Sequence, residues 1–127
     1  MTKAPLMHEP SSHEIAQRIA NLALSKKATD IKILDVKELT SVTDFFVICS
    51  GDSDLHIKAI VDEVLEKMKA DRILPWHKEG YENLQWVLVD FVDVVVHIFR
   101  REVREFYGLE TLWGDAKTEE VKDSDES

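Results

Sequence analysis

The most informative segment for the fold class is WVLVDFVDVVVHIFRREVREFYGLETLW, which spans residues 86–113. Two apolar runs, residues 85–90 and 93–99, flank a short turn, and this pattern predicts a β-hairpin. Apolar side chains point to both faces of the hairpin, as expected for central strands covered on two sides. The same stretch holds two aspartates, a histidine and several aromatic residues. It could therefore form either the wall of a catalytic site or a framework for a protein-binding surface.

The flanking residues predict helices and strands on both sides of this hairpin. In chain order, the sequence predicts a helix over residues 12–26, strands over 31–36 and 44–50, and a helix after Gly51. These are followed by an edge strand over 74–80, the hairpin, and two helical pieces over 100–107 and 109–113 that are hinged at Gly108. Pro75 assigns the strand over 74–80 to an edge or a strand start. This order predicts an α/β domain with a mixed five-stranded sheet and flanking helices.

Local signals support both long helices. Ser11 and Glu14 form a capping-box pattern before the first helix. The second helix carries one unbroken apolar stripe, formed by Ile57, Ile60, Val61, Val64, Leu65 and Met68. A stripe confined to one side of a helix predicts that the helix packs on the sheet.

Length and charge limit the class of protein. With 127 residues, the chain is long enough for one domain with a real core and too short for two ordinary ones. We expect a flexible arm over residues 1–10, a single α/β domain over 11–114, and a disordered acidic tail over 115–127, where no apolar pattern remains. The net charge of −9 disfavours direct binding to nucleic acid and to anionic membranes.

Other features indicate a cytoplasmic protein without a cofactor. No apolar run approaches the roughly 18 residues of a membrane span, and the N-terminus lacks a signal or transit pattern. Cys49 is the only cysteine, so neither an intrachain disulfide nor a thiolate metal cage can form. Its apolar neighbours predict a small buried side chain rather than a nucleophile. We expect no cofactor and no metal.

Asp90, Asp93 and His97 are the candidate catalytic or metal-binding residues. Along a strand, Asp93 and His97 would lie roughly 13 Å apart, too far to share a metal ion. His97 is therefore interpreted as a histidine satisfied inside the sheet. Asp90 and Asp93 flank the hairpin turn, where aspartate commonly accepts hydrogen bonds from nearby N–H groups. A carboxylate pair for acid–base catalysis would need a nucleophile or a second polar cluster, and the nearby sequence offers neither.

The segment CSGDSDLH, with its turn at residues 50–54, is the strongest candidate for a ligand site. A strand that runs through Ser-Gly into a helix N-terminus can bind phosphate. Asp52 and Asp54, however, already place negative charge at that helix end and would repel a phosphate. A calcium loop is excluded because Ile57 stands where that loop needs glycine. An N-cap role for Ser53 or Asp54 is the simpler interpretation.

Large apolar side chains are concentrated at residues 106–113: Phe106, Tyr107, Leu109, Leu112 and Trp113. A short helical segment near the end of the chain cannot bury all of them against a core of this size. We expect Phe106 and Leu109 to pack over the sheet. Large aromatic side chains left at a surface are typical of interface hot spots, so this segment predicts a protein-binding surface.

A family resemblance rests on six ordered blocks: TDFFVICSG, HIKAIVDEV, EGY, WVLVD, DVVVHIF and REFYGLETLW. Together they cover about residues 12–114 and resemble the ribosomal silencing factor family, also called the Iojap family. The resemblance implies a fold related to nucleotidyltransferases but without their catalysis. It also implies binding to ribosomal protein L-fourteen of the large ribosomal subunit, which sterically prevents the small subunit from joining.

With this resemblance, we assign the partner surface to Trp86, Phe91, Tyr107, Leu109, Leu112 and Trp113. Trp86 matches the tryptophan that opens the family's WxxxD strand, and the last four residues match its closing aromatic motif. The family's hairpin is usually D-[FY]-G-D, but this chain has Val92 in place of the glycine. Valine at positive φ would cost about 1–3 kcal/mol, so we expect the turn to take another form.

Three functions remain open. The first is a translation-silencing factor that binds the large subunit and has no chemistry of its own. The second is a divergent nucleotidyltransferase or nucleotide-binding protein that uses the turn at residues 50–54; the missing paired carboxylates and the acidic helix entrance argue against it. The third is a homodimer that uses the same aromatic surface on itself.

Overall fold

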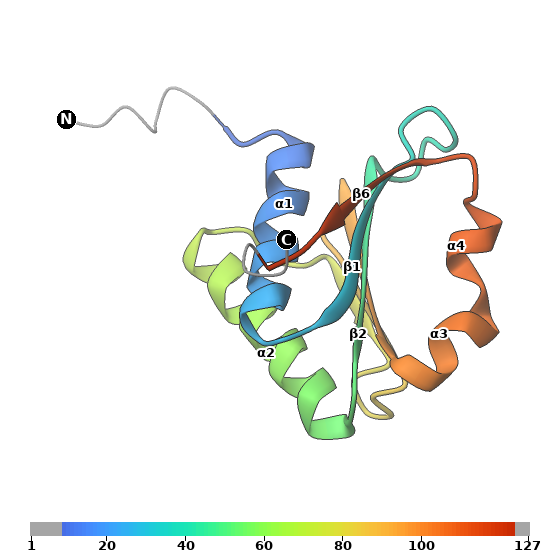
Figure 1. Cartoon of the computed structure of the whole chain (residues 1–127). Helices are drawn as coiled ribbons and strands as arrows, with labels where there is room; N and C mark the ends of the chain where they lie inside the picture. The colour runs from blue at the N-terminus through green and yellow to red at the C-terminus, as the bar shows by residue number, and fades with distance from the viewer. Residues whose placement is uncertain (1–8, 124–127) are drawn as a thin grey trace.

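A six-stranded mixed sheet with helices on both faces forms the centre of the computed structural model, which describes residues 9–123 (Figure 1). The helices are α1 (Ser12–Ser25), α2 (Asp54–Ala70), α3 (Arg101–Tyr107) and α4 (Leu109–Leu112). The strands are β1 (Thr29–Asp35), β2 (Phe45–Gly51), β3 (His77–Glu79), β4 (Trp86–Asp90), β5 (Val94–Arg100) and β6 (Lys117–Val121). The predicted α/β class and the predicted order of elements up to α4 are confirmed.

The strand order is β3-β4-β5-β2-β1-β6, so the predicted hairpin β4–β5 lies beside β2. β2 and β5 run parallel, whereas the other neighbouring pairs are antiparallel. The residues of β2 are buried along the whole strand, and those of β5 are buried up to Phe99. Burial on both faces explains why these two strands are nearly continuous apolar runs in the sequence.

Helices α1 and α2 cover one face of the sheet (Figure 1). The predicted capping box is present at the start of α1: the Ser11 hydroxyl accepts from the N–H of Glu14 at 3.1 Å, and the Glu14 carboxylate accepts from the N–H of Ser11 at 2.8 Å. The apolar stripe of α2 is buried at Ile57, Ile60, Val61, Val64 and Met68. These side chains form the main core together with α1 and the facing side of the sheet.

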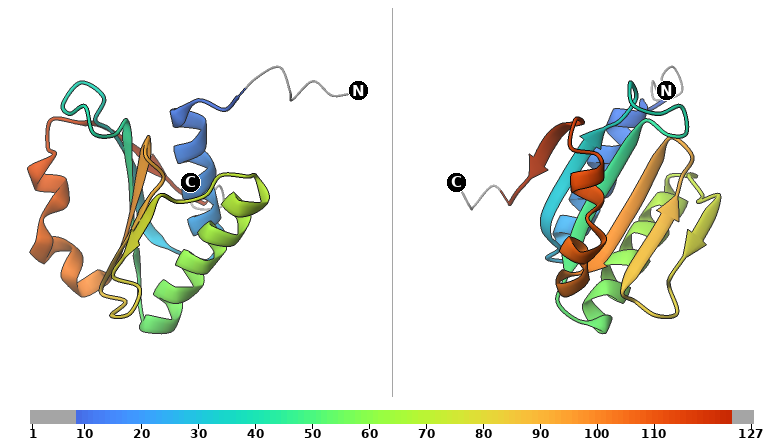
Figure 2. Two further views of the ribbon diagram at one scale, coloured as in Figure 1. Left: turned by 180° about the vertical axis from the view of Figure 1, so that it is seen from behind. Right: turned by 90° about the vertical axis from the view of Figure 1, so that its right-hand side faces the viewer.

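Helices α3 and α4 cover only part of the opposite face (Figure 2). They pack over a smaller buried cluster that includes Phe46, Ile48 and Phe99. In the right-hand view of Figure 2, both helices lie in front of the middle of the sheet, whereas β4 and β3 are uncovered on this side. Within the described residues, this face of the sheet is therefore only partly covered by helices.

The sixth strand corrects the sequence analysis. We expected five strands and a disordered tail over residues 115–127, but residues 117–121 form β6, which runs antiparallel to β1. Most side chains of β6 are exposed, so the sequence shows no apolar pattern there. Backbone pairing with β1 and the packing of Val121 against the core hold the strand. Residues 1–8 of the expected arm and 124–127 of the expected tail lie outside the described residues.

The hairpin turn adopts the conformation that the sequence analysis judged too costly. Val92 has a φ of +78°, and the N–H of Asp93 donates to the carbonyl of Phe91 at 3.0 Å, which makes a γ-turn of the rare positive-φ kind. The Asp90 carboxylate accepts from the N–H of Val92 at 2.7 Å, and the N–H of Phe91 donates to the carbonyl of Val94 at 2.8 Å. The expectation of another turn form was wrong because these hydrogen bonds hold the strained valine in place. The predicted turn role of Asp90 is confirmed.

Candidate functional site

Exposed apolar side chains on α3 and α4 form the candidate site. Phe106 is 83% exposed, Leu112 is 76% exposed and Tyr107 is 48% exposed, and we call these three residues the α3–α4 surface. The rings of Phe106 and Tyr107 meet edge to face at 5.4 Å. Clusters of large apolar side chains with this exposure are typical of protein–protein interfaces.

An aromatic stack beneath this surface brings two of the predicted residues together. The ring of Tyr107 lies 4.6 Å from the ring of Trp86, which stacks on Phe99 at 5.0 Å. The indole N–H of Trp86 donates to Nδ1 of His97 at 3.1 Å. Trp86 and Tyr107, which the sequence analysis assigned to one surface, are thus in contact. The α3–α4 surface therefore packs on side chains whose positions are set by contacts within the sheet.

The structure places the other predicted residues differently. Phe91 is only 9% exposed and packs in the main core with α1 and α2, so the expectation that it joins the same surface as Tyr107 was wrong. Side chains alternate along a strand, and Phe91 continues the core-facing series of Val89. Leu109 and Trp113 are half-buried against the smaller cluster. They support the surface rather than form its most exposed part.

Phe106, which we expected to pack over the sheet, points away from it. Val103, Arg104 and Tyr107 lie on the inward side of α3. With 3.6 residues per turn, this arrangement directs Phe106 outward. Leu109, by contrast, packs against the smaller cluster as predicted. The sequence could not decide which side of so short a helix would face the sheet.

His97 is a buried histidine within the aromatic stack. It is 4% exposed, and burial lowers the pKa of His97 to about 4. The neutral ring accepts the Trp86 N–H at Nδ1, so its own proton is assigned to Nε2. Nε2 is buried without a hydrogen-bond partner among the described residues, and the ring of Phe46 lies edge to face at 5.0 Å. The prediction of a histidine inside the sheet is confirmed, but only Nδ1 has a hydrogen-bond partner among the described residues.

A buried arginine, which the sequence analysis missed, ties α4 to the sheet. Arg104 donates from Nη1 to the hydroxyl of Ser50 at 2.7 Å and from Nε to the carboxylate of Glu110 at 2.8 Å. Lys32 lies 3.1 Å from the same carboxylate. The hydrogen bond from Arg104, opposed by burial and assisted by Lys32, lowers the pKa of the Glu110 carboxyl. No pattern in the sequence pointed to this burial, because the sequence did not show which side of α3 faces the sheet.

The carboxylates at the entrance of α2 are engaged in ion pairs. Asp54 pairs with Arg100 at 2.6 Å, and Asp52 pairs with Arg101. Both arginines lie where β5 ends and α3 begins, so the pairs join this end of the sheet to α2. The negative charge that the sequence analysis placed at this helix end therefore serves internal contacts.

The backbone of the same turn is also engaged. Ser53 is the N-cap of α2, as predicted, and its hydroxyl accepts from the N–H of His56 at 3.1 Å. The N–H of Asp52 donates to Nδ1 of His56 at 2.9 Å. A Cβ atom at Gly51 would lie 2.7 Å from Cδ1 of Ile57, so close packing against α2 explains this glycine. These contacts leave no observation that favours a nucleotide in the turn at residues 50–54.

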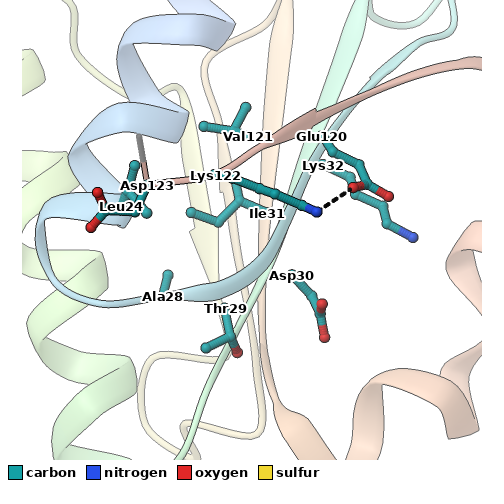
Figure 3. Close-up of a pocket in the computed structure, with 10 residues that line it drawn as sticks. All are labelled: Leu24, Ala28, Thr29, Asp30, Ile31, Lys32, Glu120, Val121, Lys122 and Asp123. Atoms are coloured by element: carbon teal, nitrogen blue, oxygen red, sulfur yellow. Dashed lines mark ion pairs between the residues drawn. The ribbon is translucent and has the colours of Figure 1, made fainter. Parts of the chain in front are cut away.

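A groove of about 480 Å³ lies between the start of β1 and the end of β6 (Figure 3). Its walls carry charges of both signs, from Asp30, Lys32, Glu120 and Lys122, and Lys122 pairs with Glu120 at 3.6 Å. This mixture favours neither an anionic nor a cationic ligand. Over residues 9–123, no group of three or more acidic, histidine or cysteine side chains could hold a metal ion. Within the same range, no helix has the length and apolar character of a membrane span.

Comparison with known proteins identifies the family of this chain. The family model for "ribosomal silencing factor during starvation" matches residues 9–127. The chain belongs to the ribosomal silencing factor family. A curated relative named ribosomal silencing factor RsfS, from Halalkalibacterium halodurans, is 40% identical over 112 residues, which are 88% of this chain and 96% of the relative.

Two further relatives are a solved structure and a mitochondrial protein. A solved structure of a protein from Chromobacterium violaceum matches with a TM-score of 0.81 and 33% identity, over 92% of this chain and 98% of that chain. A mouse relative named mitochondrial assembly of ribosomal large subunit protein 1 is 37% identical over 98 residues, which are 75% of this chain and 43% of the relative. The nucleotidyltransferase-like description of the fold stays a prediction.

Proposed function

We propose that this ribosomal silencing factor represses translation by binding ribosomal protein L-fourteen on the large subunit, where it sterically blocks the small subunit. The α3–α4 surface makes the contact, with Trp86 supporting it from below. The observation that carries this proposal is the exposure of Phe106, Tyr107 and Leu112 on an aromatic base fixed to the sheet. Exposed anchors of this kind dominate the binding energy of interfaces.

The charge of the chain supports a protein partner. With a net charge of −9, the chain is repelled by ribosomal RNA and attracted by a basic ribosomal protein. The name of the mouse relative refers to the large ribosomal subunit, which supports that subunit as the target here. The proposed site of action is the ribosome in the cytoplasm.

The proposed mechanism is steric and requires no catalysis. Asp90 serves the hairpin turn, and the polar groups at residues 50–54 are engaged in capping and ion pairs. The nucleotidyltransferase alternative therefore has no observation of its own in the described residues.

Sedimentation with separated subunits tests the proposal. We expect the purified chain to cosediment with isolated large subunits, not with small ones, and to lower the yield of joined ribosomes when both subunits are mixed. If joining is undiminished while the chain saturates the large subunit, the steric mechanism is wrong. If the chain sediments only with small subunits, the assigned partner is wrong.

A further inference from the structure

We propose that the partner interface extends beyond the α3–α4 surface onto the uncovered part of the sheet formed by β3 and β4. This area, which we call the open face, consists of Trp76, His77, Glu79, Leu88 and Asp90. It receives a basic, partly apolar segment of the same partner protein. The inference rests on the proposed function and adds a second contact area to it.

The open face is continuous with the α3–α4 surface through β4. Val87 and Val89 are buried in the main core, so alternation along the strand directs Trp86 and Leu88 to the opposite face. Trp86 contacts Tyr107 there, and Leu88, the next residue on the same side, is partly buried against the smaller cluster. The right-hand view of Figure 2 shows β4 emerging from beside α3 without a covering element.

Strand β3 extends this face to the edge of the sheet. In the antiparallel register, His77 lies opposite Asp90 and Glu79 lies opposite Leu88. Directly opposed residues in neighbouring strands share a face, so His77 and Glu79 stand on the open face. All three residues of β3 are exposed.

Trp76 stands at the far end of the open face. Its N–H donates to the carbonyl of Asp90 at 2.7 Å, and its ring lies 6.2 Å from the ring of His77. The side chain is 76% exposed, although a tryptophan offers a large apolar area. Together with Leu88, it gives the open face an apolar component of the kind found at hot spots.

The charged groups on the open face are mainly acidic. The open face holds two carboxylates, those of Glu79 and Asp90, while the one lysine of β3 lies elsewhere. That lysine, Lys78, faces the other side of the sheet, where its ammonium lies 4.6 Å from the ring centre of Tyr81. The Glu79 and Asp90 carboxylates stand on the open face, where Nε2 of His77 lies 2.5 Å from Glu79 and the N–H of Val92 donates to Asp90. Neither β3 nor β4 places a lysine or arginine on this face.

This combination identifies the chemistry of the occupant. Carboxylates beside a tryptophan and a leucine complement a segment that carries lysine or arginine next to an apolar side chain. An RNA backbone would be repelled by the same carboxylates. A second copy of this chain, docked symmetrically by the same patch, would bring carboxylates against carboxylates. The basic protein partner is therefore the occupant that the charges favour.

A matched pair of charge reversals tests the open face. Glu79→Lys changes it, whereas Glu66→Lys makes the same charge change on α2, which lies across the sheet. Each variant changes the formal net charge from −9 to −7, since a lysine replaces a glutamate. With isolated large ribosomal subunits as the probe, we expect Glu79→Lys to weaken binding about tenfold and Glu66→Lys to change it less than about twofold. Both melting temperatures should stay close to that of the unaltered chain.

Trp76→Ser provides a second, uncharged test. The exposed ring contributes little to the core, so we expect folding to be unchanged and large-subunit binding to weaken about tenfold. If Tyr107→Ala weakens binding but Trp76→Ser and Glu79→Lys bind like Glu66→Lys, the open face is not part of the interface, while the proposed function stands. If the unaltered chain binds no large subunit, both proposals fall. If Trp76→Ser dissociates a dimer in sedimentation velocity and binds subunits normally, the occupant is a second copy.

Discussion

At Val92 the backbone has a φ of +78°, in a region that β-branched residues rarely adopt. The conformation persists because Asp90 accepts the N–H of Val92 and because β4 and β5 are paired up to the turn. A residue held this way costs about 1–3 kcal/mol, which the surrounding hydrogen bonds offset. The strain is local, so it can be tested by one substitution.

We expect Val92→Gly to raise the free energy of unfolding by about 1 kcal/mol. Relief of about 1–3 kcal/mol of strain exceeds the roughly 0.4–1 kcal/mol lost to the greater freedom of glycine in the unfolded chain. Urea denaturation at neutral pH measures the difference. Val42→Gly is the control, because Val42 is exposed but is not among the positive-φ residues. There the glycine should lower stability, and equal effects at both sites would contradict the explanation.

His97 links stability to pH through its burial. Burial lowers its pKa from 6.5 to about 4, so the folded state favours the neutral ring. Between these values the unfolded chain binds the proton more readily than the folded chain does. The contribution of His97 is therefore fully present above pH 6.5 and is lost as the pH falls towards 4, with a slope of up to about 1.4 kcal/mol per pH unit.

His97→Gln should remove this part of the pH dependence. The glutamine amide oxygen can still accept the Trp86 N–H, but the side chain does not titrate. Urea unfolding between pH 7 and about 5 should show a shallower loss of stability in the variant than in the unaltered chain, whatever their absolute stabilities. Parallel curves for the two proteins would show that His97 is not the group responsible.

Among the elements, β6 forms through pairing rather than through an apolar pattern. It lies along the outer edge of β1, with Ile31 opposite Val121 and Asp35 opposite Lys117. Val121 packs against the main core, while the other four positions are exposed. An edge strand with charged side chains also keeps β1 from pairing with other chains.

We expect deletion of residues 117–127 to lower the free energy of unfolding by about 1–3 kcal/mol. Each lost backbone hydrogen bond contributes about 0.5–1.5 kcal/mol net, and the ordering entropy regained by the freed segment offsets part of the loss. Deletion of residues 124–127 is the control, because it leaves β6 in place. Thermal and urea unfolding of the two truncated chains distinguish them. Equal stabilities would mean that β6 does not contribute to the folded domain.

For the whole molecule, unequal coverage of the two sheet faces provides both a core and an interface. Helices α1 and α2 bury one face with long apolar stripes. The shorter α3 and α4 enclose a smaller cluster on the other face and leave β3 and β4 uncovered (Figure 2). Side chains at the rim of the smaller cluster are therefore held in place by the packed residues beneath them and remain exposed to solvent.

Substitutions at the rim of the smaller cluster should weaken binding alone, whereas substitutions at its base should weaken binding and also lower stability. Leu112→Ser should weaken large-subunit binding by about 30-fold or more at an unchanged melting temperature, because Leu112 is 76% exposed. Trp86→Ala should impair both, since Trp86 stacks on Phe99 and donates to His97, and loss of a packed aromatic costs about 3–5 kcal/mol. Melting curves and subunit cosedimentation of both variants give the answer. Normal binding by Leu112→Ser would exclude α4 from the interface.

The α/β class, the hairpin, the N-caps and the buried stripe of α2 could be predicted from the amino-acid sequence. These features depend on signals carried within a few residues: periodicity of apolar side chains, capping residues such as Ser11 and Ser53, and turn residues such as Asp90. Local chemistry is enough for such features because neighbours in the chain supply both partners of each interaction.

Features whose interacting partners are distant in the chain became known from the folded structure alone. Strand β6 forms because it pairs with the edge of β1, and such backbone pairing requires no pattern of apolar side chains in the sequence. Arg104 can be buried because Ser50 and Glu110 accept hydrogen bonds from its guanidinium group. The strained turn at Val92 persists because the paired strands β4 and β5 hold its backbone in place. The extent of the candidate interface follows in the same way, because it depends on which strands the short helices α3 and α4 leave uncovered.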